Sequence, residues 1–449
     1  MAKLTENSNS FSEKVTPDFN SMIKILFWNS MGFFFFNFMV PYVTGQLMDA
    51  SGTQLGFMFS AFTIGAIIST PLVGYFTDRS SKKNLVLFGS IGRGISYIWM
   101  YITILFRSLI GFTGSMLFLG MSVGVFWPPF NALVSEKSNK ENRSTAFGKS
   151  YGKMGIGNLV GACIGVPIFV VIDNFFPGLE FIQYSPLLLY AISNFYAGIY
   201  FSKNVDEDLT YDRFLNSEVE SLPQQNMEKL SNNEEDVKEF LKSEPSKEPF
   251  FKNMPKGLAF GLLLMILGMF FANMNESMAY PFLQAYLTAN IQDNATIIML
   301  IYFPSGILTL IISPKIGELC DKINLPLGVA LSSFLGALTT FFLIRTDSEI
   351  LFSLLLIIDS TLATAGGLIL QNVMSRVNKT NRGKLFGLQG WLGRLGGVLG
   401  PIIGGLAWDK FGTQSPFIIS IFVELALIPI FILTLKTLEP VMEEKISKK

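Results

Sequence analysis

The chain has 449 residues, of which 50% are hydrophobic and 15% charged, and its 34 Lys and Arg residues balance 34 Asp and Glu residues. A soluble domain of average composition carries about 25% charged residues, and the zero net charge gives no reason to expect a nucleic-acid partner. The sequence contains no histidine, which excludes Ser-His-Asp hydrolysis, His-ligated metal centres and imidazole proton relays. We therefore expect no enzyme and no cofactor, and any proton transfer has to use carboxylates.

The chain opens with a polar tail, residues 1–22, and then carries six long apolar segments. Each is close to the ~20 residues that a helix needs to cross a ~30 Å hydrocarbon layer. None shows the alternation of a β-strand, so we expect membrane-spanning helices rather than a barrel. The six segments run over 23–45, 54–77, 84–106, 111–134, 146–172 and 184–202.

A polar linker, residues 203–256, separates this half (23–202) from a second group of six apolar segments (257–436). The linker is rich in Glu, Ser, Asn and Lys, a composition typical of disorder or of short surface helices. A tail of residues 437–449 ends the chain. The second six segments run over 257–282, 294–316, 325–345, 350–374, 386–408 and 415–436.

The distribution of Lys and Arg predicts the orientation. Most of these residues fall on one side of the membrane if both termini and the linker share that side. Because basic residues favour the cytoplasmic side, we expect both termini in the cytoplasm. The sequence thus predicts a multi-pass protein of the cell membrane, surrounded by lipid and monomeric.

The two halves repeat each other in sequence at an offset of about 240 residues, which is typical of a parallel internal repeat. The first predicted helix contains GFFFFN at 32–37, and the seventh contains GMFFAN at 268–273. Two bundles related in this way close at one membrane face while they open at the other, with a binding site between them. Glycines of the fifth and eleventh helices also match, namely Gly157, Gly161 and Gly165 with Gly396, Gly400 and Gly404.

A charged motif follows the second predicted helix. The motif and its weaker second copy read Gly74-Tyr-Phe-Thr-Asp78-Arg79-Ser-Ser81-Lys82-Lys83 and Gly317-Glu-Leu-Cys-Asp321-Lys322. The motif resembles the G-x-x-x-D-R-x-G-R/K-R/K signature of the major facilitator superfamily, although Ser81 replaces the second glycine. The resemblance extends over the whole chain and implies an all-α membrane protein of twelve transmembrane helices in two pseudo-symmetric six-helix bundles.

The same resemblance implies a latch at the cytoplasmic face. Asp78 would face the positive N-terminal end of the eleventh helix, and by the repeat Asp321 would face the start of the fifth. Arg79 would pair with an acid such as Glu136. The alternative is a solvated basic loop that only sets topology. The candidate gating residues are Gly74, Asp78, Arg79, Glu136, Arg143, Gly317, Asp321 and Lys322.

The eleventh helix carries a run of small residues that resembles a glycine motif of the family's antiporters, where it occupies the fifth helix. Glycines let helix backbones approach closely, and a proline kinks the helix. Plain helix packing and an antiporter-specific role both fit this pattern. The residues are Gly396, Gly400, Pro401, Gly404 and Gly405.

Glu276 lies in the most polar stretch of any predicted helix, residues 273–277. Burying a charge in the membrane costs about 2.5 kcal/mol or more, so such residues are candidates for function. We expect Glu276 to contact the substrate or to accept a proton; the alternative is a neutral, hydrogen-bonded acid. The repeat-related Asn37 and Asn273 would offer hydrogen bonds to a substrate or join two helices.

Four further charged residues lie inside predicted helices. Asp359 and Arg394 are predicted to form an ion pair that substrate binding rearranges. Arg93 and Glu424 are on helices that the family directs towards lipid, so a structural role is expected for both. The candidate substrate and coupling residues are Glu276, Asp359, Arg394, Asn37, Asn273, Asn275 and Trp127.

The sequence thus predicts an alternating-access secondary transporter of a small organic solute, coupled to protons or sodium, with export of amphipathic compounds as the first interpretation. A sugar or carboxylate uptake symporter and a non-transporting membrane sensor are the alternatives. The second helix lacks the acids of the family's sodium–sugar symporters. The fourth lacks the basic residue that proton-coupled drug exporters of the family commonly carry, which argues against proton-driven drug export.

Overall fold

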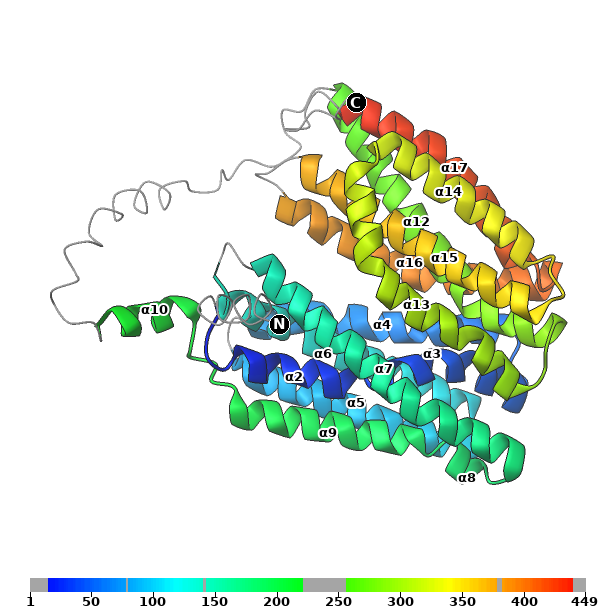
Figure 1. The fold of residues 1–449 in the computed structure, drawn as a ribbon, viewed down its shortest axis with the longest axis horizontal. Helices are drawn as coiled ribbons and strands as arrows, with labels where there is room; N and C mark the ends of the chain where they lie inside the picture. Colours follow the sequence, from blue (N-terminus) through cyan, green and yellow to red (C-terminus); the bar gives the residue numbers. More distant parts are fainter. Residues whose placement is uncertain (1–14, 78–79, 140–142, 221–255, 378–381, 439–449) are drawn as a thin grey trace, which may run out of the picture.

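The structure is a computed structural model that describes residues 15–77, 80–139, 143–220, 256–377 and 382–438. Within these ranges the chain is helical, and its one β contact is an isolated bridge between Val15 and Ser138. Figure 1 shows two bundles of helices, the first formed by residues up to 204 and the second from 256 onwards, with a short helix at 211–220 extending away from the first. The bundles approach each other at one end and diverge towards the end that carries both termini.

The first bundle follows the predicted segments closely. Its opening segment is divided into α2, α3 and a π-helical turn η1, and two short helices, α8 and α10, were not predicted individually. The elements are α2 Phe19–Ser30, α3 Phe33–Tyr42, η1 Val43–Leu47, α4 Gly52–Thr77, α5 Lys82–Leu105, α6 Leu109–Glu136, α7 Arg143–Phe175, α8 Glu180–Gln183, α9 Pro186–Asn204 and α10 Tyr211–Glu220.

The second bundle contains six long helices, one for each predicted segment. Side-chain caps fix helix starts in both bundles. Ser81 accepts a hydrogen bond from the backbone of Asn84, Ser108 accepts one from Gly111, and Asn294 accepts one from Ile297. Both residue types are preferred caps. The helices are α12 Lys256–Asn290, α13 Ala295–Lys322, α14 Leu325–Leu343, α15 Glu349–Val377, α16 Arg382–Phe411 and α17 Ser415–Leu438.

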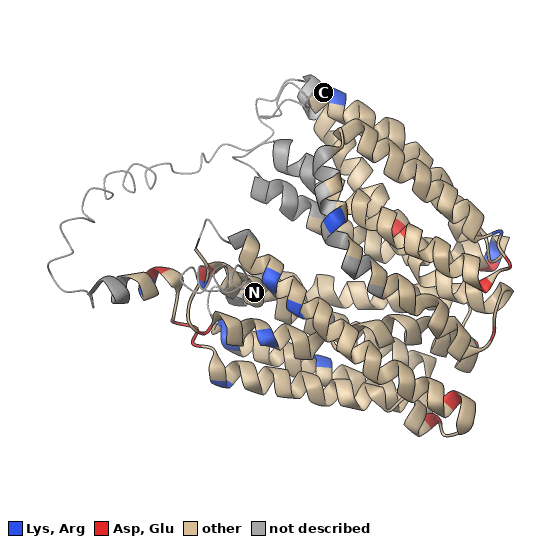
Figure 2. Ribbon diagram, viewed as in Figure 1, with Lys and Arg blue, Asp and Glu red and all other residues tan. Residues whose placement is uncertain are grey.

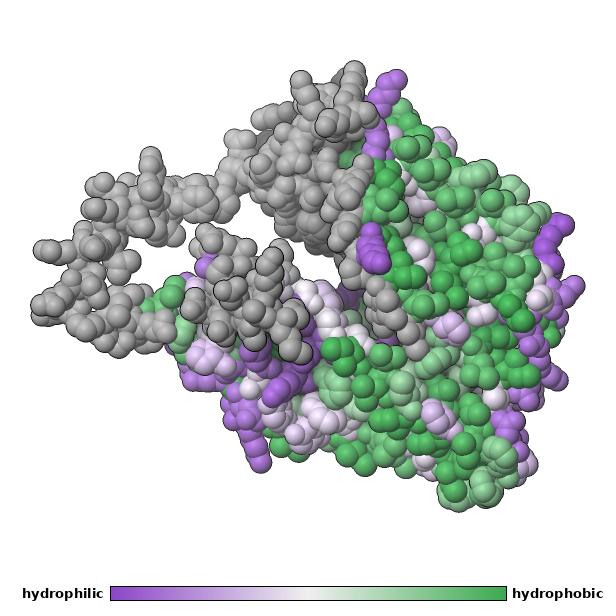
Figure 3. All heavy atoms as spheres, viewed as in Figure 1, coloured by the Kyte–Doolittle hydropathy of each residue, from purple (hydrophilic) through white to green (hydrophobic). Residues whose placement is uncertain are grey.

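The molecule is a multi-pass integral membrane protein. Among the described residues, nine helical segments are long and apolar enough to cross a membrane. Charged residues of the described helices gather mainly at the ends of the two bundles (Figure 2), and an apolar surface covers much of the face between them (Figure 3). These features confirm the predicted all-α membrane fold.

The first spanning segment is broken at Gly32, whereas the sequence predicts one continuous helix over 23–45. The break lies where other helices come very close. A Cβ at Gly32 would be 2.7 Å from the hydroxyl of Tyr97, and a Cβ at Gly161 would be 1.7 Å from the carbonyl oxygen of Met31. Close packing against α5 and α7 therefore occurs at the break.

The eleventh spanning helix, α16, uses its glycines for the equivalent contact in the second half. Cβ atoms at Gly400 and Gly404 would lie 2.4 Å and 2.7 Å from carbonyl oxygens of Met274 and Met278 on α12. On the other side of α16, a Cβ at Gly405 would lie 2.3 Å from the carbonyl oxygen of Gly52 on α4. The glycine run thus lets α16 touch both its own bundle and the opposite one.

The apolar core shows which end of the molecule is closed. One cluster spans both bundles at the end away from the termini, joining residues such as Phe36 and Met39 to Phe282 and Ile298. The two clusters nearer the termini each remain within one bundle. The structure is therefore closed at the far end and separates towards the termini.

Candidate functional site

A cavity of about 730 Å³ lies mainly within the second bundle and reaches the first. Five helices of the second bundle line it, namely α12, α13, α14, α15 and α17. The first bundle adds Phe34, Asn37, Phe38 and Pro41 from α3 and Asn158 from α7. This volume is within the range of sites for small organic molecules.

Three carboxyl groups from three helices face this cavity: Glu276 of α12, Asp359 of α15 and Glu424 of α17. Asp359 lies within electrostatic range of both others. In the part of the chain that the structure describes, none of the three forms an ion pair. Unpaired carboxylates at membrane depth are costly, so the cavity favours protons or cationic groups.

Polar and aromatic side chains accompany the carboxyls. Gln284 and Tyr302 each hold a buried polar atom without a hydrogen-bond partner, and so does Asn158 across the cavity. Tyr280 is 50% exposed beside Glu276, which is exposed too. A ligand with an apolar body and a polar or cationic group matches these surroundings.

Five predicted substrate residues line the cavity: Asn37, Asn273, Asn275, Glu276 and Asp359. The amide of Asn273 donates to the carbonyl oxygen of Met269, one turn earlier in α12, at 2.7 Å. Asn275 instead donates to Glu424, at 3.4 Å. The polar stretch 273–277 therefore supplies the cavity with both a carboxyl and amides.

Two predicted substrate residues lie elsewhere. Trp127 packs against Phe126 and Phe130 in the first bundle. Arg394 donates to α4, with its Nη1 atom 3.0 Å from the carbonyl oxygen of Ala66 and 2.8 Å from the hydroxyl of Thr70.

The predicted ion pair between Arg394 and Asp359 is absent from this conformation. The guanidinium is drawn to the opposite bundle because α16 and α4 are in direct contact at this level, where Ser60 also donates to the carbonyl oxygen of Val398 at 2.7 Å.

Glu424, for which only a structural role is predicted, also lines the cavity. Arg93 does have a structural setting. It is 1% exposed, donates to the carbonyl oxygen of Asn29 at 2.7 Å, and lies over the ring of Phe33. The missed cavity residues with carboxyl, amide or phenol groups are Glu424, Tyr280, Gln284, Tyr302 and Asn158.

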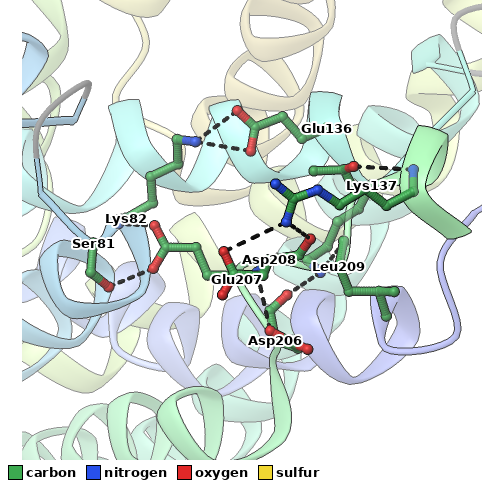
Figure 4. Close-up of polar contacts among 10 residues, drawn as sticks. Ser81, Lys82, Glu136, Lys137, Asp206, Glu207, Asp208 and Leu209 are labelled. Atoms are coloured by element: carbon green, nitrogen blue, oxygen red, sulfur yellow. Dashed lines mark hydrogen bonds and ion pairs between the residues drawn. The ribbon is translucent and has the colours of Figure 1, made fainter.

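Most of the predicted latch lies outside what the structure describes. Asp78 and Arg79 are outside the described residues, and the structure describes neither the surroundings of Gly74 and Gly317 nor the side chains of Arg143, Asp321 and Lys322. The partner of Glu136 is Lys82, at 2.8 Å. Glu136 therefore forms an ion pair with Lys82, which belongs to the same motif as the predicted partner Arg79 (Figure 4).

A group of polar contacts next to this motif was not predicted. Glu207, in the segment after α9, accepts hydrogen bonds from the backbone of Lys82 and Lys83 and from the hydroxyl of Ser81 (Figure 4). Lys137 is fully buried and donates to Asp18 at 2.8 Å and to the carbonyl oxygens of Asp206 and Leu209. The first residues of the linker are thereby bound to the first bundle.

Replacing Glu207 with Ala should lower the stability of the first bundle by about 1 kcal/mol, the usual effect of losing a helix cap. The carboxylate lies at the N-terminus of α5, where it satisfies free N–H groups. The measurement is a thermal unfolding curve in detergent. Asp208→Ala is the control, since the Asp208 side chain is 90% exposed; an equal shift in both variants would contradict a specific cap.

The model of the Major Facilitator Superfamily matches residues 25–375 and 265–449 of this chain. Multidrug resistance protein 2 of Bacillus subtilis (strain 168) is 25% identical over 125 residues, which are 27% of this chain and 29% of that protein. Quinolone resistance protein NorA of Staphylococcus aureus (strain MRSA252) is 26% identical over 154 residues, 32% and 38% of the two chains. The chain thus aligns with about a third of these relatives' length.

Solved structures share the fold over nearly the whole chain. One, described as giving structural insights into substrate recognition in proton dependent oligopeptide transporters, has a TM-score of 0.67 at 14% identity, covering 95% of this chain and 98% of that one. The nucleoside transporter NupG has a TM-score of 0.65 at 14% identity, with coverages of 93% and 99%. These structures share the two-bundle fold, and the family model, which matches more than half of the chain, shows that the chain belongs to the major facilitator superfamily.

Proposed function

We propose that this protein exports a small amphipathic organic cation in exchange for protons, by alternating access of the cavity to the two membrane faces. The observation that carries the proposal is the cavity's three carboxyl groups, for which the described residues supply no cationic partner. A cation or a proton can each neutralise such a group, but a carboxylate that holds one excludes the other. This competition couples export to proton entry.

The carboxyls that face the solute in this proposal are Glu276 and Asp359. Glu276 is exposed towards the cavity, beside the aromatic ring of Tyr280. An aromatic face next to a carboxylate binds an organic cation through both electrostatic and cation–π attraction. The absence of a basic residue in α6 is compatible with this scheme, because the carboxyls themselves carry the exchanged proton.

Alternating access follows from the contacts between the bundles. They touch at the far end and separate towards the termini, so exchange of the solute requires the far contacts to open. We place both termini in the cytoplasm, in accordance with the basic residues, and expect a monomer in the cell membrane. The structure then corresponds to a conformation that faces the cytoplasm, in which an exporter loads its solute.

The relatives support export over the alternatives. Those reported above are a multidrug and a quinolone resistance protein, and an acidic, partly aromatic cavity suits a cation better than a sugar or a carboxylate.

The proposal is tested with tetraphenylphosphonium, whose permanent charge carries no proton of its own. In inside-out proteoliposomes, acidifying the interior should drive accumulation of this cation inside the vesicles and alkalise the lumen, as followed by a trapped pH dye. Protein-free vesicles are the control. Cation movement that ignores the imposed pH gradient would exclude proton exchange, and movement of a neutral sugar or an organic anion in its place would exclude the cation.

A further inference from the structure

Glu424 is held in the wall of the cavity by two neighbouring helices. On α12, the amide nitrogen of Asn275 donates to Oε1 of Glu424 at 3.4 Å. On α14, a Cβ added to Gly336 would lie 2.9 Å from Oε2 of Glu424. Glycine at position 336 therefore makes room for the carboxyl, which is fixed against α14 on one side and bonded to α12 on the other.

This contact leaves two acceptor oxygens unmatched. Oε2 of Glu424 and Oδ1 of Asn275 are both buried and have no hydrogen-bond partner, and Asn275 is 5% exposed. A buried acceptor without a donor costs about 1–3 kcal/mol. The two unmatched oxygens belong to the same pair of side chains, so a single donor between them would satisfy both.

Protonation of the Glu424 carboxyl supplies a donor that fits this position. A protonated carboxyl and a primary amide form a cyclic pair, in which the acid O–H donates to the amide oxygen and the amide N–H donates to the other acid oxygen. The second of these bonds is already present. Both free oxygens are closed to water, which leaves space for a proton but not for an ammonium group. Among the described residues, no three potential ligands are grouped to hold a metal ion.

We propose that Glu424 and Asn275 form a proton-binding site in the second bundle, separate from Glu276 and Asp359, the two carboxyls that face the solute. In this conformation the proton is covalently bound to Oε2 of Glu424 and hydrogen-bonded to Oδ1 of Asn275. The site deepens the proposed function, and its part in transport rests on that function. The site keeps the Glu424 carboxyl neutral while the cavity is open towards the termini.

The groups around Glu424 explain why its charge state matters. In the cavity, α12 contributes Glu276 and Tyr280, α13 Tyr302 and α15 Asp359, whereas α14 contributes no titratable group. The guanidinium of Arg394 on α16 is bonded to α4 instead.

Asp359 is therefore the carboxyl that interacts with Glu424. Two like charges in a medium of low polarity repel strongly, so the pair titrates as a unit. A proton on Glu424 allows Asp359 to remain ionised and to attract a cation.

Infrared spectroscopy of the purified protein in lipid tests the site without any solute, through the carbonyl stretch of protonated carboxyl groups at neutral pH. Glu424→Gln should remove intensity equal to one carboxyl. The Gln amide can make both hydrogen bonds of the protonated acid, so this variant should fold. Asn275→Leu should keep the band and move it to the frequency of a carboxyl without a hydrogen bond. Glu180→Gln, which removes an acid paired with Arg107 at 2.9 Å, should leave the band unchanged.

An identical spectrum for Glu424→Gln and Glu180→Gln would show that Glu424 is ionised and would overturn the proposal, whether or not the Asn275→Leu variant can be purified. A band that is lost in Glu424→Gln but does not move in Asn275→Leu would overturn the shared proton. Failure of the proposed function has a different signature, namely wild-type vesicles that do not couple cation movement to the pH gradient, and it leaves the infrared result intact.

Discussion

Replacing Glu276 with Gln should reduce proton-driven movement of tetraphenylphosphonium by about 10-fold to 100-fold. The Gln side chain keeps the size and hydrogen-bonding capacity of Glu but has neither the charge nor the exchangeable proton. An interaction with a charged group contributes about 1.5–3 kcal/mol, which corresponds to this range. Asp359→Asn should have a similar effect, since the two carboxyls interact and face the same cavity.

Two measurements separate the roles of Glu276. Equilibrium binding of the cation reports attraction of the solute, and pH-driven uptake reports coupling. Loss of both indicates that Glu276 contacts the cation, whereas loss of uptake alone indicates that it carries only the proton. Because the two carboxyls share one function, the double variant should be little worse than either single variant. Wild-type uptake and coupling in Glu276→Gln would remove this residue from the mechanism; Glu180→Gln is the matched control.

The sequence was sufficient to predict the helices and part of the cavity. Long apolar segments are a strong signal, and the observed helices follow them closely. Glu276 was found because it interrupts an apolar helix together with two amides. For Glu424 a structural role is expected because the family directs this helix towards lipid. Since α17 is apolar on all faces, its sequence gives no indication that the residue lines the cavity. Its position depends on Gly336, a contact between helices that are distant in sequence.

Contacts that depend on the conformation also could not be predicted from the sequence. Arg394 was predicted to pair with Asp359, but in this state it bonds to Thr70 of the opposite bundle. The buried Lys137 donates to residues about 70 positions later in the chain, and these residues lie in a polar segment whose composition indicates only a linker. Such contacts depend on tertiary packing, which local composition does not encode.

Replacing Asp409 with Ala should shift the protein towards the conformation that opens at the far face. Asp409, near the end of α16, accepts hydrogen bonds from the backbone of Gly52 and Thr53, both at 2.8 Å. It thus caps the N-terminus of α4 in the opposite bundle. Loss of a helix cap costs about 0.5–2 kcal/mol, and because Asp409 is exposed we expect about 1 kcal/mol, roughly a 5-fold change in the ratio of the two states.

A second contact joins the repeat-related helices. Asp173, near the end of α7, accepts a hydrogen bond from the hydroxyl of Thr296 in α13 at 3.0 Å, and Asn174 donates to the same hydroxyl at 2.7 Å. Since the two contacts share no residues, their free energies should add. Asp173→Ala combined with Asp409→Ala should therefore shift the equilibrium further than either change alone.

The shift can be measured as a distance between spin labels at Phe106 and Ile350, which are 80% and 76% exposed near the far ends of the two bundles. Both native cysteines, Cys163 and Cys320, are first replaced with Ser. The population with a long distance should grow in Asp409→Ala and grow more in the double variant. Lys410→Ala, an exposed neighbour on α16, is the control. Equal distance distributions in all four proteins would show that these carboxylates do not hold the far face closed.

The Asp409 contact at the far face can be compared with the latch predicted near the termini. There Asp78 of the second helix is expected to face the start of the eleventh, whereas at the far face Asp409 of the eleventh caps the start of the second. The same two helices would thus exchange the roles of carboxylate and helix N-terminus at opposite ends. Since the bundles separate at one end when they close at the other, Asp78→Asn should favour the state opposite to that favoured by Asp409→Ala. Spin-label distances that move in the same direction in both variants would contradict this reciprocal arrangement.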